Sequence, residues 1–207
     1  MTWLDLTRLA PMERYKLLTA VVIPRPVAWV TTQDRAGLVN AAPFSFFNLF
    51  GQDPALVILG LEHHRDGSGP KDTARNIAET GEFVVNIVTP DLVGPMVASA
   101  AAYPAGVSEP GVLGLALSPS GRVAPPRIAD APAAIECRLL DRLRYSDERD
   151  IVVGEAVGLA AREGLIDTGR MHVDWAGAFP VARLFADRYA RLEEIARHPI
   201  PRLTGET

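Results

Sequence analysis

The feature of this 207-residue chain that most constrains its fold is a series of short apolar runs, each shorter than a typical helix. Residues 27–32, 55–61 and 83–88 are rich in valine, isoleucine and leucine, and residues 33–37 after the first run have the composition of a turn. Residues 38–39 resume an extended pattern after that turn, which predicts a hairpin. These runs predict buried strands.

The second half of the chain continues the strand pattern. Ile135, Cys137 and Leu139 alternate with Glu136 and Arg138, which predicts a strand with one face in water. Residues 151–161 form another extended run, in which Gly154 and Gly158 predict bulges or a close approach of backbones. Near the end, by contrast, Tyr189, Leu192 and Ile195 fall at helical spacing.

Few helices interrupt these strands. One is predicted between the second and third runs, with Asp72 or Thr73 as N-cap and Gly81 as its C-terminal stop. Residues 103–133 hold many prolines, glycines and serines and are interpreted as an ordered loop or lid. We therefore expect residues 1–207 to form a single, mainly β domain with peripheral helices (α+β), a barrel or sandwich and not a doubly wound sheet.

Composition excludes some classes of function. The net charge of −4 and the pI near 5.6 argue against nucleic acid as a partner, because phosphate-backbone binding needs a basic surface. Cys137 is the only cysteine, so no internal disulfide can form and a reducing cytoplasm is expected. No apolar run approaches the ~20 residues that span a bilayer, and no signal peptide is evident, so no membrane partner is expected.

Lys71, Asp72 and Thr73 place a cation and a hydroxyl at the predicted start of a helix. The first N–H groups of a helix lack intrahelical partners and carry partial positive charge, so this combination suits a phosphate. Residues 67–73 match neither a Walker loop nor a dinucleotide fingerprint. The alternative is that Asp72 and Thr73 merely cap a surface helix while Lys71 is solvated.

Residues 40–48 mix three phenylalanines with small polar side chains. Phe46 and its neighbours could simply be core, as aromatic residues usually are. Ser45 and Asn48 distinguish a core segment from a ligand site. Polar groups among apolar neighbours need hydrogen-bond partners, and the carbonyl and nitrogen atoms of a heteroaromatic ring would provide them. The alternative is that Ser45 and Asn48 form hydrogen bonds with the backbone of a turn.

These segments together resemble a known family. Residues 23–32, 40–48 and 71–77 (Ile-Pro-Arg-Pro-Val-Ala-Trp-Val-Thr-Thr, Asn-Ala-Ala-Pro-Phe-Ser-Phe-Phe-Asn and Lys-Asp-Thr-Ala-Arg-Asn-Ile) are similar to the flavin reductase-like, flavoredoxin-type proteins with an FMN-binding split β-barrel. The resemblance implies a homodimer with FMN near the subunit interface. It also implies hydride transfer from NAD(P)H to flavin N5, with electrons passed on to a small-molecule or flavin acceptor.

The resemblance also implies a set of cofactor-binding residues. Thr31 and Thr32 would approach the ribityl or phosphate part, whereas Ser45, Phe46 and Asn48 would flank the ring. Lys71, Asp72 and Thr73 would form the phosphate end. The catalytic residues stay unknown, because the chemistry of the flavin strictly requires no side-chain general acid. The family tends to show Arg-Leu-Gly-Gly near the C-terminus, but here Phe185-Ala186 follow Arg183-Leu184, and Phe185 needs space that glycine would not.

Two rival functions remain open: a non-catalytic FMN-binding electron carrier, and an interaction module whose flavin site has decayed. No metal site is expected, because His63 and His64 are neighbours on an extended segment and point apart. His172 is expected at the surface, and Cys137 is expected to be an inert core residue.

Overall fold

The computed structural model describes residues 1–201 and is mainly β, as predicted. The helices are α1 (Pro11–Val21), α2 (Asp72–Thr80), α3 (Val93–Ala98) and α4 (Glu109–Leu113), with 3-10 turns η1 (Leu6–Arg8) and η2 (Pro90–Leu92). The strands are β1 (Arg25–Pro26), β2 (Ala28–Gln33), β3 (Val39–Phe44), β4 (Phe47–Gln52), β5 (Ala55–Glu62), β6 (Glu82–Ile87), β7 (Leu117–Ser118), β8 (Arg127–Ile128), β9 (Ala133–Ser146), β10 (Arg149–Ala161), β11 (Ile166–Asp167), β12 (His172–Val173), β13 (Ala182–Arg183) and β14 (Tyr189–Ala190).

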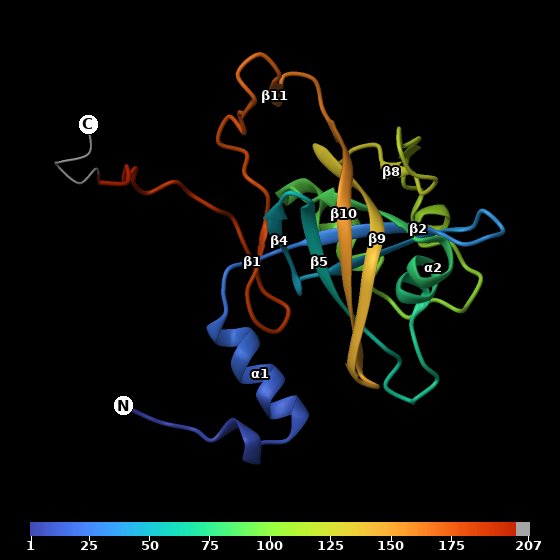
Figure 1. Ribbon diagram of the computed structural model, residues 1–207, viewed down its shortest axis with the longest axis vertical. Coiled ribbons are helices and arrows are strands. Elements are labelled where there is room, and N and C mark those ends of the chain that lie inside the picture. The colour runs from blue at the N-terminus through green and yellow to red at the C-terminus, as the bar shows by residue number, and fades with distance from the viewer. Residues whose placement is uncertain (202–207) are drawn as a thin grey trace.

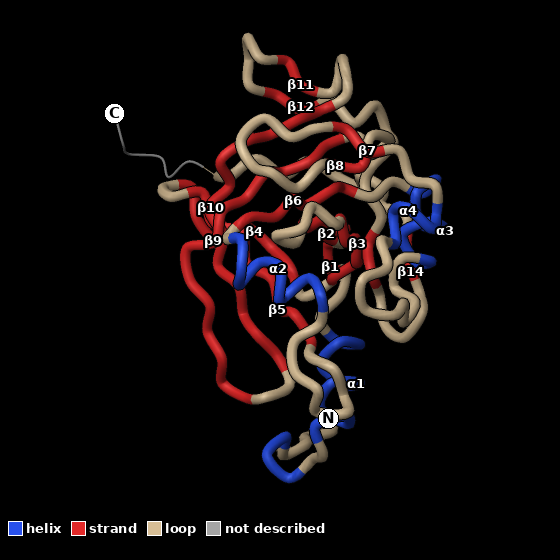
Figure 2. The backbone as a smooth tube through the Cα atoms, turned by 90° about the vertical axis from the view of Figure 1, so that its right-hand side faces the viewer, coloured by secondary structure: helices blue, strands red, loops and turns tan. Residues whose placement is uncertain are grey.

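One seven-stranded antiparallel sheet dominates the fold, in the order β3-β2-β6-β9-β10-β5-β4. Its two edge strands, β3 and β4, are consecutive in the chain and are joined only by Ser45 and Phe46. A flat sheet would hold these edges about 29 Å apart, whereas the three steps from Phe44 to Phe47 reach about 11 Å at most. The sheet must therefore curl and bring its two edges together (Figure 2). The edge strand β3 contacts β5, the strand next to the other edge.

The curled sheet has a core on each face of β2. Ala28 and Val30 point into one cluster with Leu59 and Phe83, and Ala74 and Ile77 of α2 close it. Trp29 points the other way, into a second cluster that includes Met96 of α3 and Ile128 of β8. Both faces of β2 are covered, and five of its six residues are therefore buried.

The segment 103–133 is ordered and forms a wall over the sheet. The carboxylate of Glu136 accepts the N–H groups of Gly121 and Arg122 at 2.8 and 2.6 Å, and that of Glu82 accepts Ala124 N–H at 2.8 Å. Glu136 is only 4% exposed. The prediction of a water-facing strand surface at Glu136 is therefore wrong, because alternation along one strand cannot reveal a distant segment that covers it.

Two predicted helix features also differ in the structure. Helix α2 begins at Asp72 with Lys71 as N-cap, one or two residues earlier than predicted, while Gly81 ends it in a left-handed conformation as expected. Tyr189 lies in β14, which pairs with β13, and no helix follows it in the described part of the chain up to residue 201. Three apolar residues at helical spacing are weak evidence for a helix, because the same segment can instead pair with a neighbouring strand.

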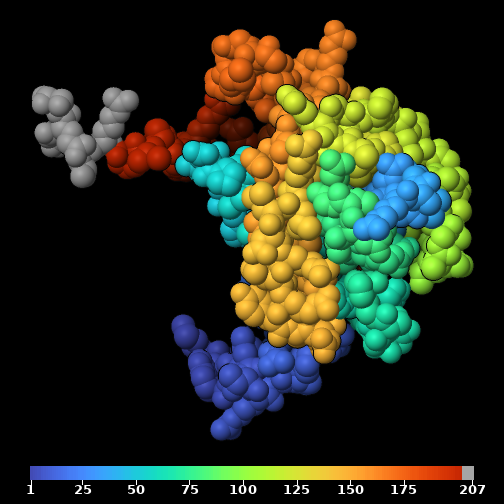
Figure 3. Space-filling model, turned by 45° about the vertical axis from the view of Figure 1, so that its right-hand side comes forward, coloured from blue at the N-terminus to red at the C-terminus, as the bar shows by residue number. Residues whose placement is uncertain are grey.

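The N-terminal helix α1 stands apart from this body, at the lower end of Figure 1 and as the dark blue lobe of Figure 3. Only Thr19 of α1 is buried. Within residues 1–201, no helix is long and apolar enough to cross a membrane. The cytoplasmic location and the absence of a membrane partner stay predictions.

Gly154 on β10 is required by close packing. The ladder of β10 with β9 shifts register at Gly154, and a Cβ there would lie 2.5 Å from Cζ of the fully buried Phe83. We expect Gly154→Val to lower the free energy of unfolding by about 2 kcal/mol, because overpacking displaces a core ring. Urea unfolding measures this, and Gly94→Ala, where a Cβ meets nothing within 4 Å, is the matched control. Equal stability of the two variants would contradict the packing argument.

Cys137 lies in the first core cluster and is fully buried, as predicted. Burial, with the nearby Glu136, raises the pKa of its thiol to about 12, so the thiolate is scarce at pH 8. We expect a disulfide reagent to leave the native protein unmodified at pH 8 and to label one thiol per chain in denaturant. Rapid labelling of the native protein would show that the thiol is not enclosed as described.

Candidate functional site

A cleft of about 450 Å³ opens along the seam where the two edges of the sheet meet. Its walls come from β3, the link at Ser45 and Phe46, β5, the start of α2 and the segment after α3. Helix α1 contributes Tyr15, and the C-terminal strands contribute Arg183 and Tyr189. The cleft therefore collects side chains from nearly the whole length of the chain.

One end of the cleft is formed by the N-terminus of α2. Lys71, Asp72 and Thr73 all line the cleft, and no side chain among residues 1–201 caps the helix there. The first N–H groups of a helix need partners and attract negative charge. This end thus offers backbone N–H groups, a lysine and a hydroxyl, which is a donor set for an anion.

The charge of Lys71 is at present balanced by Glu62. Lys71 Nζ lies 3.4 Å from Glu62 Oε2, and both side chains are partly exposed. Burial alone would raise the pKa of Glu62, but Lys71 and Arg65 outweigh it and hold that pKa below its usual range. An anion in the cleft would compete with Glu62 for Lys71, while Asp72 already pairs with Arg75.

The other end of the cleft is built around Phe46. The Tyr15 ring centroid lies 6.1 Å from that of Phe46, and the Arg149 guanidinium lies 4.3 Å from it. Arg149 also donates to Gly60 O at 3.1 Å, and a Cβ at Gly60 would lie 3.0 Å from that of Phe46. Phe46 is thus held by its neighbours at the cleft wall and remains 37% exposed, as a stacking surface would be.

Arg25 connects the cleft to the elements around it. Its Nε donates to Ser45 Oγ at 3.4 Å, and its terminal nitrogens donate to Val22 O at 2.9 Å and Leu184 O at 2.6 Å. The Ser45 hydroxyl accepts from Arg25, which leaves its own proton free to donate into the cleft. Burial is the main cause that lowers the pKa of Arg25.

The structure brings together five of the eight residues implied by the resemblance: Ser45, Phe46, Lys71, Asp72 and Thr73. It does not bring Thr31, Thr32 or Asn48 to the cleft wall. Thr31 donates to Pro126 O at 2.6 Å, and Thr32 accepts from Asn76 Nδ2 at 3.1 Å, both fully buried. Asn48 is exposed on β4 and accepts the N–H of Leu49.

Several cleft residues were missed by the sequence reasoning, among them Tyr15, Asn40, Glu109, Arg149 and Arg183. They lie outside the segment 71–73 and far from one another in sequence. Only Asn40 had a local signal, since it begins the segment 40–48. The others reach the cleft through tertiary structure alone.

Phe185 does not occupy the cleft. It is not among the lining residues, and the Arg188 guanidinium lies 4.9 Å from its ring centroid. Ala186 has φ 53°, a left-handed conformation that glycine adopts more easily. The backbone thus keeps a glycine-type turn here, and the space that Phe185 needs is found outside the cleft.

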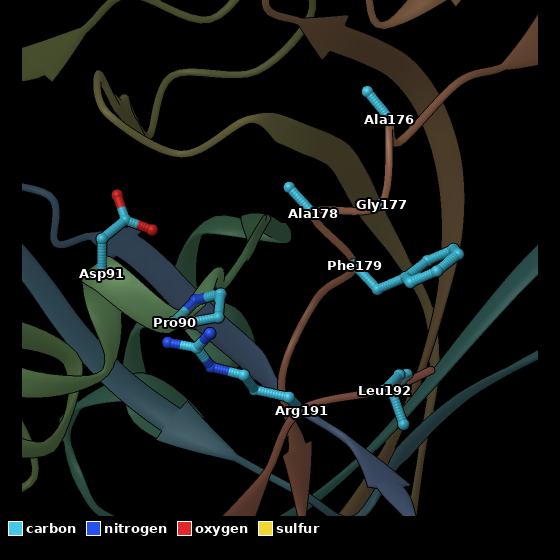
Figure 4. A pocket seen from close by; sticks show the side chains of 8 residues that line it. All are labelled: Pro90, Asp91, Ala176, Gly177, Ala178, Phe179, Arg191 and Leu192. Carbon is cyan, nitrogen blue, oxygen red and sulfur yellow. The ribbon is translucent and has the colours of Figure 1, made fainter. Parts of the chain in front are cut away.

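A second, larger cleft of about 620 Å³ lies between η2 and the C-terminal segment (Figure 4). Among residues 1–201, Asp91 and Arg191 are the only ionisable residues that line it, and the other lining residues are mainly small or apolar. It has no helix N-terminus of useful length, because η2 is a 3-residue turn. This second cleft therefore offers fewer groups that could bind a charged ligand than the seam cleft does, although its volume is larger.

The histidines do not form a metal centre among residues 1–201, where no group of three or more suitable side chains occurs. His63 Nε2 instead lies 3.1 Å from Asp150, which Arg144 also contacts at 2.7 Å. His64 lines the seam cleft, and His172 is exposed on β12 as expected.

Comparisons with known proteins agree with this geometry. Residues 20–182 match the family model of the flavin reductase-like domain. An uncharacterized protein of Deinococcus radiodurans is 43% identical over 88% of this chain and 82% of its own length.

Two solved structures are similar over nearly the whole chain. The 2-nitrobenzoate 2-nitroreductase NbaA of Pseudomonas fluorescens is 38% identical, with a TM-score of 0.87 over 97% of this chain and 96% of that one. Nitrilotriacetate monooxygenase component B of Bacillus cereus is 30% identical, with a TM-score of 0.88 over 96% and 98%. The fold, the cleft and these matches show that the chain belongs to the flavin reductase-like family of split-barrel proteins.

Proposed function

We propose that this protein is an FMN-dependent oxidoreductase and that the seam cleft binds FMN. The observation that carries the proposal is the uncapped N-terminus of α2, with Lys71 and Thr73 beside it at one end of the cleft. FMN ends in a phosphate monoester, which carries close to two negative charges at pH 7. The donors at this end of the cleft fit such a group better than they fit a neutral ligand.

Different residues of the cleft would contact different parts of FMN. The α2 N–H groups, Lys71 and Thr73 would hold the phosphate, with Lys71 released from Glu62. Phe46 would offer an apolar surface to the ring, and Ser45 a hydroxyl donor. Arg149 and Arg183 add positive charge to the cleft wall, which favours an electron-rich ring.

When bound, the flavin would supply the redox chemistry, accepting hydride from NADH or NADPH and passing electrons to a small-molecule or flavin acceptor. The protein would orient the ring and stabilise the negative charge that the ring carries when it is reduced. The names of NbaA, a nitroreductase, and of the monooxygenase component B support an oxidoreductase role. The two structures match 97% and 96% of this chain, which supports treating residues 1–207 as one domain.

The rival interpretations predict different behaviour. A decayed flavin site would be filled or closed, whereas here the cleft is open and its phosphate end still has its donors. A non-catalytic electron carrier would bind FMN equally well but would not oxidise NAD(P)H. Reduction by nicotinamide therefore separates the enzyme from the carrier.

We also propose a homodimer in which a second copy covers α1. Met12, Tyr15, Leu17, Leu18 and Val21 of this helix are all exposed. An 11-residue helix is marginal in water unless an apolar face is packed. Because Tyr15 also lines the cleft, a partner on α1 would lie beside the bound FMN, as the resemblance implies.

Lys71→Ala tests the phosphate assignment. We expect FMN to bind about tenfold or more weakly, because an ion pair to phosphate is lost, while riboflavin, which lacks phosphate, binds as before. Quenching of flavin fluorescence measures both affinities. Arg170→Ala, which removes a 76% exposed cation outside the cleft lining, is the control and should change neither. An unchanged FMN affinity in Lys71→Ala would show that the phosphate does not bind at this end of the cleft.

Leu18→Glu tests the dimer. Leu18 is 47% exposed on α1, and a charge there should not be tolerated in an apolar interface. We expect light scattering to show a dimer for the wild type and a monomer for Leu18→Glu. Val112→Glu, at a 61% exposed position on α4, should remain a dimer. A monomeric wild type would rule out the proposed interface.

A further inference from the structure

Two arginines lie opposite each other beside the ring end of the seam cleft, the end that holds Ser45 and Phe46. Arg25 of β1 and Arg183 of β13 are direct partners in an antiparallel ladder, so their side chains extend on the same face of it. Arg25 reaches Ser45 Oγ, and Arg183 lines the cleft together with Tyr189. Both guanidinium groups are therefore close to the ring end.

The charges of this pair are not balanced by an acid. Within the described residues 1–201, neither Arg25 nor Arg183 forms an ion pair with a carboxylate. Burial lowers the pKa of Arg25 most, and the charge of Arg183 lowers it further, against an opposing effect of Tyr15. Like charges that face each other across a ladder are destabilising, and an anion beside the pair would relieve this repulsion.

The N–H groups of Arg25 are already used. Its Nε, Nη1 and Nη2 all donate, and every acceptor is a neutral oxygen. The acceptors are the carbonyl groups of Thr19, Val22 and Leu184 and the hydroxyl of Ser45. Arg25 is thus hydrogen-bonded but not neutralised, and it has little left to offer a ligand.

Arg183 keeps N–H groups for a ligand. Its guanidinium lies 4.5 Å from the centroid of the Tyr189 ring, and Nη2 donates to Ala186 O. These two contacts fix the plane of the group, while its Nε and Nη1 donate to no residue in the part of the chain that the structure describes. A fixed guanidinium with unused N–H groups suits a carboxylate or a phosphate, which can accept two parallel hydrogen bonds from it.

The acidic residues of the cleft lie at the phosphate end and have partners there. Glu62 pairs with Lys71, Asp72 pairs with Arg75, and Glu109 accepts a backbone N–H. They leave the charge of Arg183 for a ligand.

Arg149, the other arginine in the cleft lining, is less suited to this role. Its guanidinium lies over the Phe46 ring. Burial lowers the pKa of Arg149, whereas the carboxylates of Glu62 and Glu148 raise it. Acidic neighbours thus already offset the charge of Arg149, which they do not do for Arg183.

We propose that Arg183 is a specificity-determining residue of the seam cleft and that it binds an oxyanion, a carboxylate or a phosphate, on the second substrate that meets the flavin. This inference rests on the proposed function, because it takes the Ser45 and Phe46 end of the cleft as the place of the flavin ring. With the FMN phosphate at the start of α2, the N–H groups of Arg183 remain for another anion. That anion belongs either to the phosphates of NADH or NADPH or to a carboxylate of the electron acceptor.

Benzoate is a suitable probe, because it carries a carboxylate on a flat ring and has no group that a flavin reduces. We expect benzoate to perturb the absorption spectrum of the FMN-loaded protein. Arg183→Gln should weaken benzoate binding about tenfold or more, since a charge-assisted pair is lost. Arg183→Lys keeps the charge without the planar fork and should recover only part of the affinity. Benzamide, which lacks the charge, should bind the wild type and Arg183→Gln equally.

Arg188→Gln is the matched control. Arg188 lies at the tip of the same β13–β14 hairpin, is exposed with its guanidinium over Phe185, and does not line the cleft. This variant removes the same charge from the same turn and should leave benzoate binding unchanged. Fluorescence quenching should give the same affinity for oxidised FMN in the wild type, Arg183→Gln and Arg188→Gln.

Thermal unfolding gives a second readout that needs no flavin. A ligand that binds only the folded state raises the Tm. Benzoate should therefore raise the Tm of FMN-free wild-type protein more than that of Arg183→Gln, and benzamide should not distinguish the two proteins.

Steady-state kinetics separate the two sources of the anion, with riboflavin as an uncharged acceptor. A KM for NADH or NADPH that rises in Arg183→Gln assigns the oxyanion to the nucleotide. If that KM is unchanged while benzoate binding is lost, the oxyanion is a carboxylate of the acceptor. Both results support the site at Arg183.

Equal benzoate affinity in the wild type and in Arg183→Gln, or no benzoate binding at all, would overturn the proposal. An equal loss in Arg188→Gln would also overturn it, since the general charge of the hairpin would then explain the effect. If FMN binds and benzoate binding does not depend on Arg183, this inference alone is wrong. If FMN does not bind but benzoate still raises the Tm through Arg183, the proposed function fails and the oxyanion site stands.

Discussion

The structure depends on one short connection. Ser45 and Phe46 join the two edge strands of a seven-stranded sheet, so β3 and β4 cannot be far apart and the sheet has to curl. The seam where the edges meet cannot be closed by a full ladder, because the link itself lies in it. The cleft opens at this seam, and the two linking residues line it.

Other elements of the fold bring functional groups to the cleft at the seam. Helix α2 packs over the end of the first core with Ala74 and Ile77, which directs its N-terminus to the cleft. Glu136 and Glu82 bind backbone N–H groups of the segment 103–133 and hold it over the sheet. Glu109 in this segment then reaches β3, so a stretch that looks like loop in sequence completes the wall of the cleft.

Much of this could be predicted from the sequence where the determinants are local. The strands at 27–32, 55–61 and 83–88 were predicted correctly, because an apolar run reports burial directly. The bulges at Gly154 and Gly158 were also predicted correctly. The burial of Glu136 and the strand at Tyr189 were missed, because each depends on a segment distant in sequence.

The same distinction holds for the cleft. Lys71, Asp72 and Thr73 reach it as one turn of helix, whereas Thr31 and Thr32 are turned to opposite faces of a strand whose two faces are both covered. Arg149 and Arg183 could not be predicted, since only the curl of the sheet and the C-terminal strands bring them to the seam. Which of the cleft residues contact FMN stays a prediction.

The most direct test of the account is the visible absorption spectrum of the protein incubated with FMN and freed of excess, before and after NADH or NADPH is added without oxygen. We predict flavin bands that remain with the protein and bleach when one of the nicotinamides is added. Bands that persist with both nicotinamides would contradict the oxidoreductase and favour the electron carrier. A colourless protein would contradict the flavin site itself.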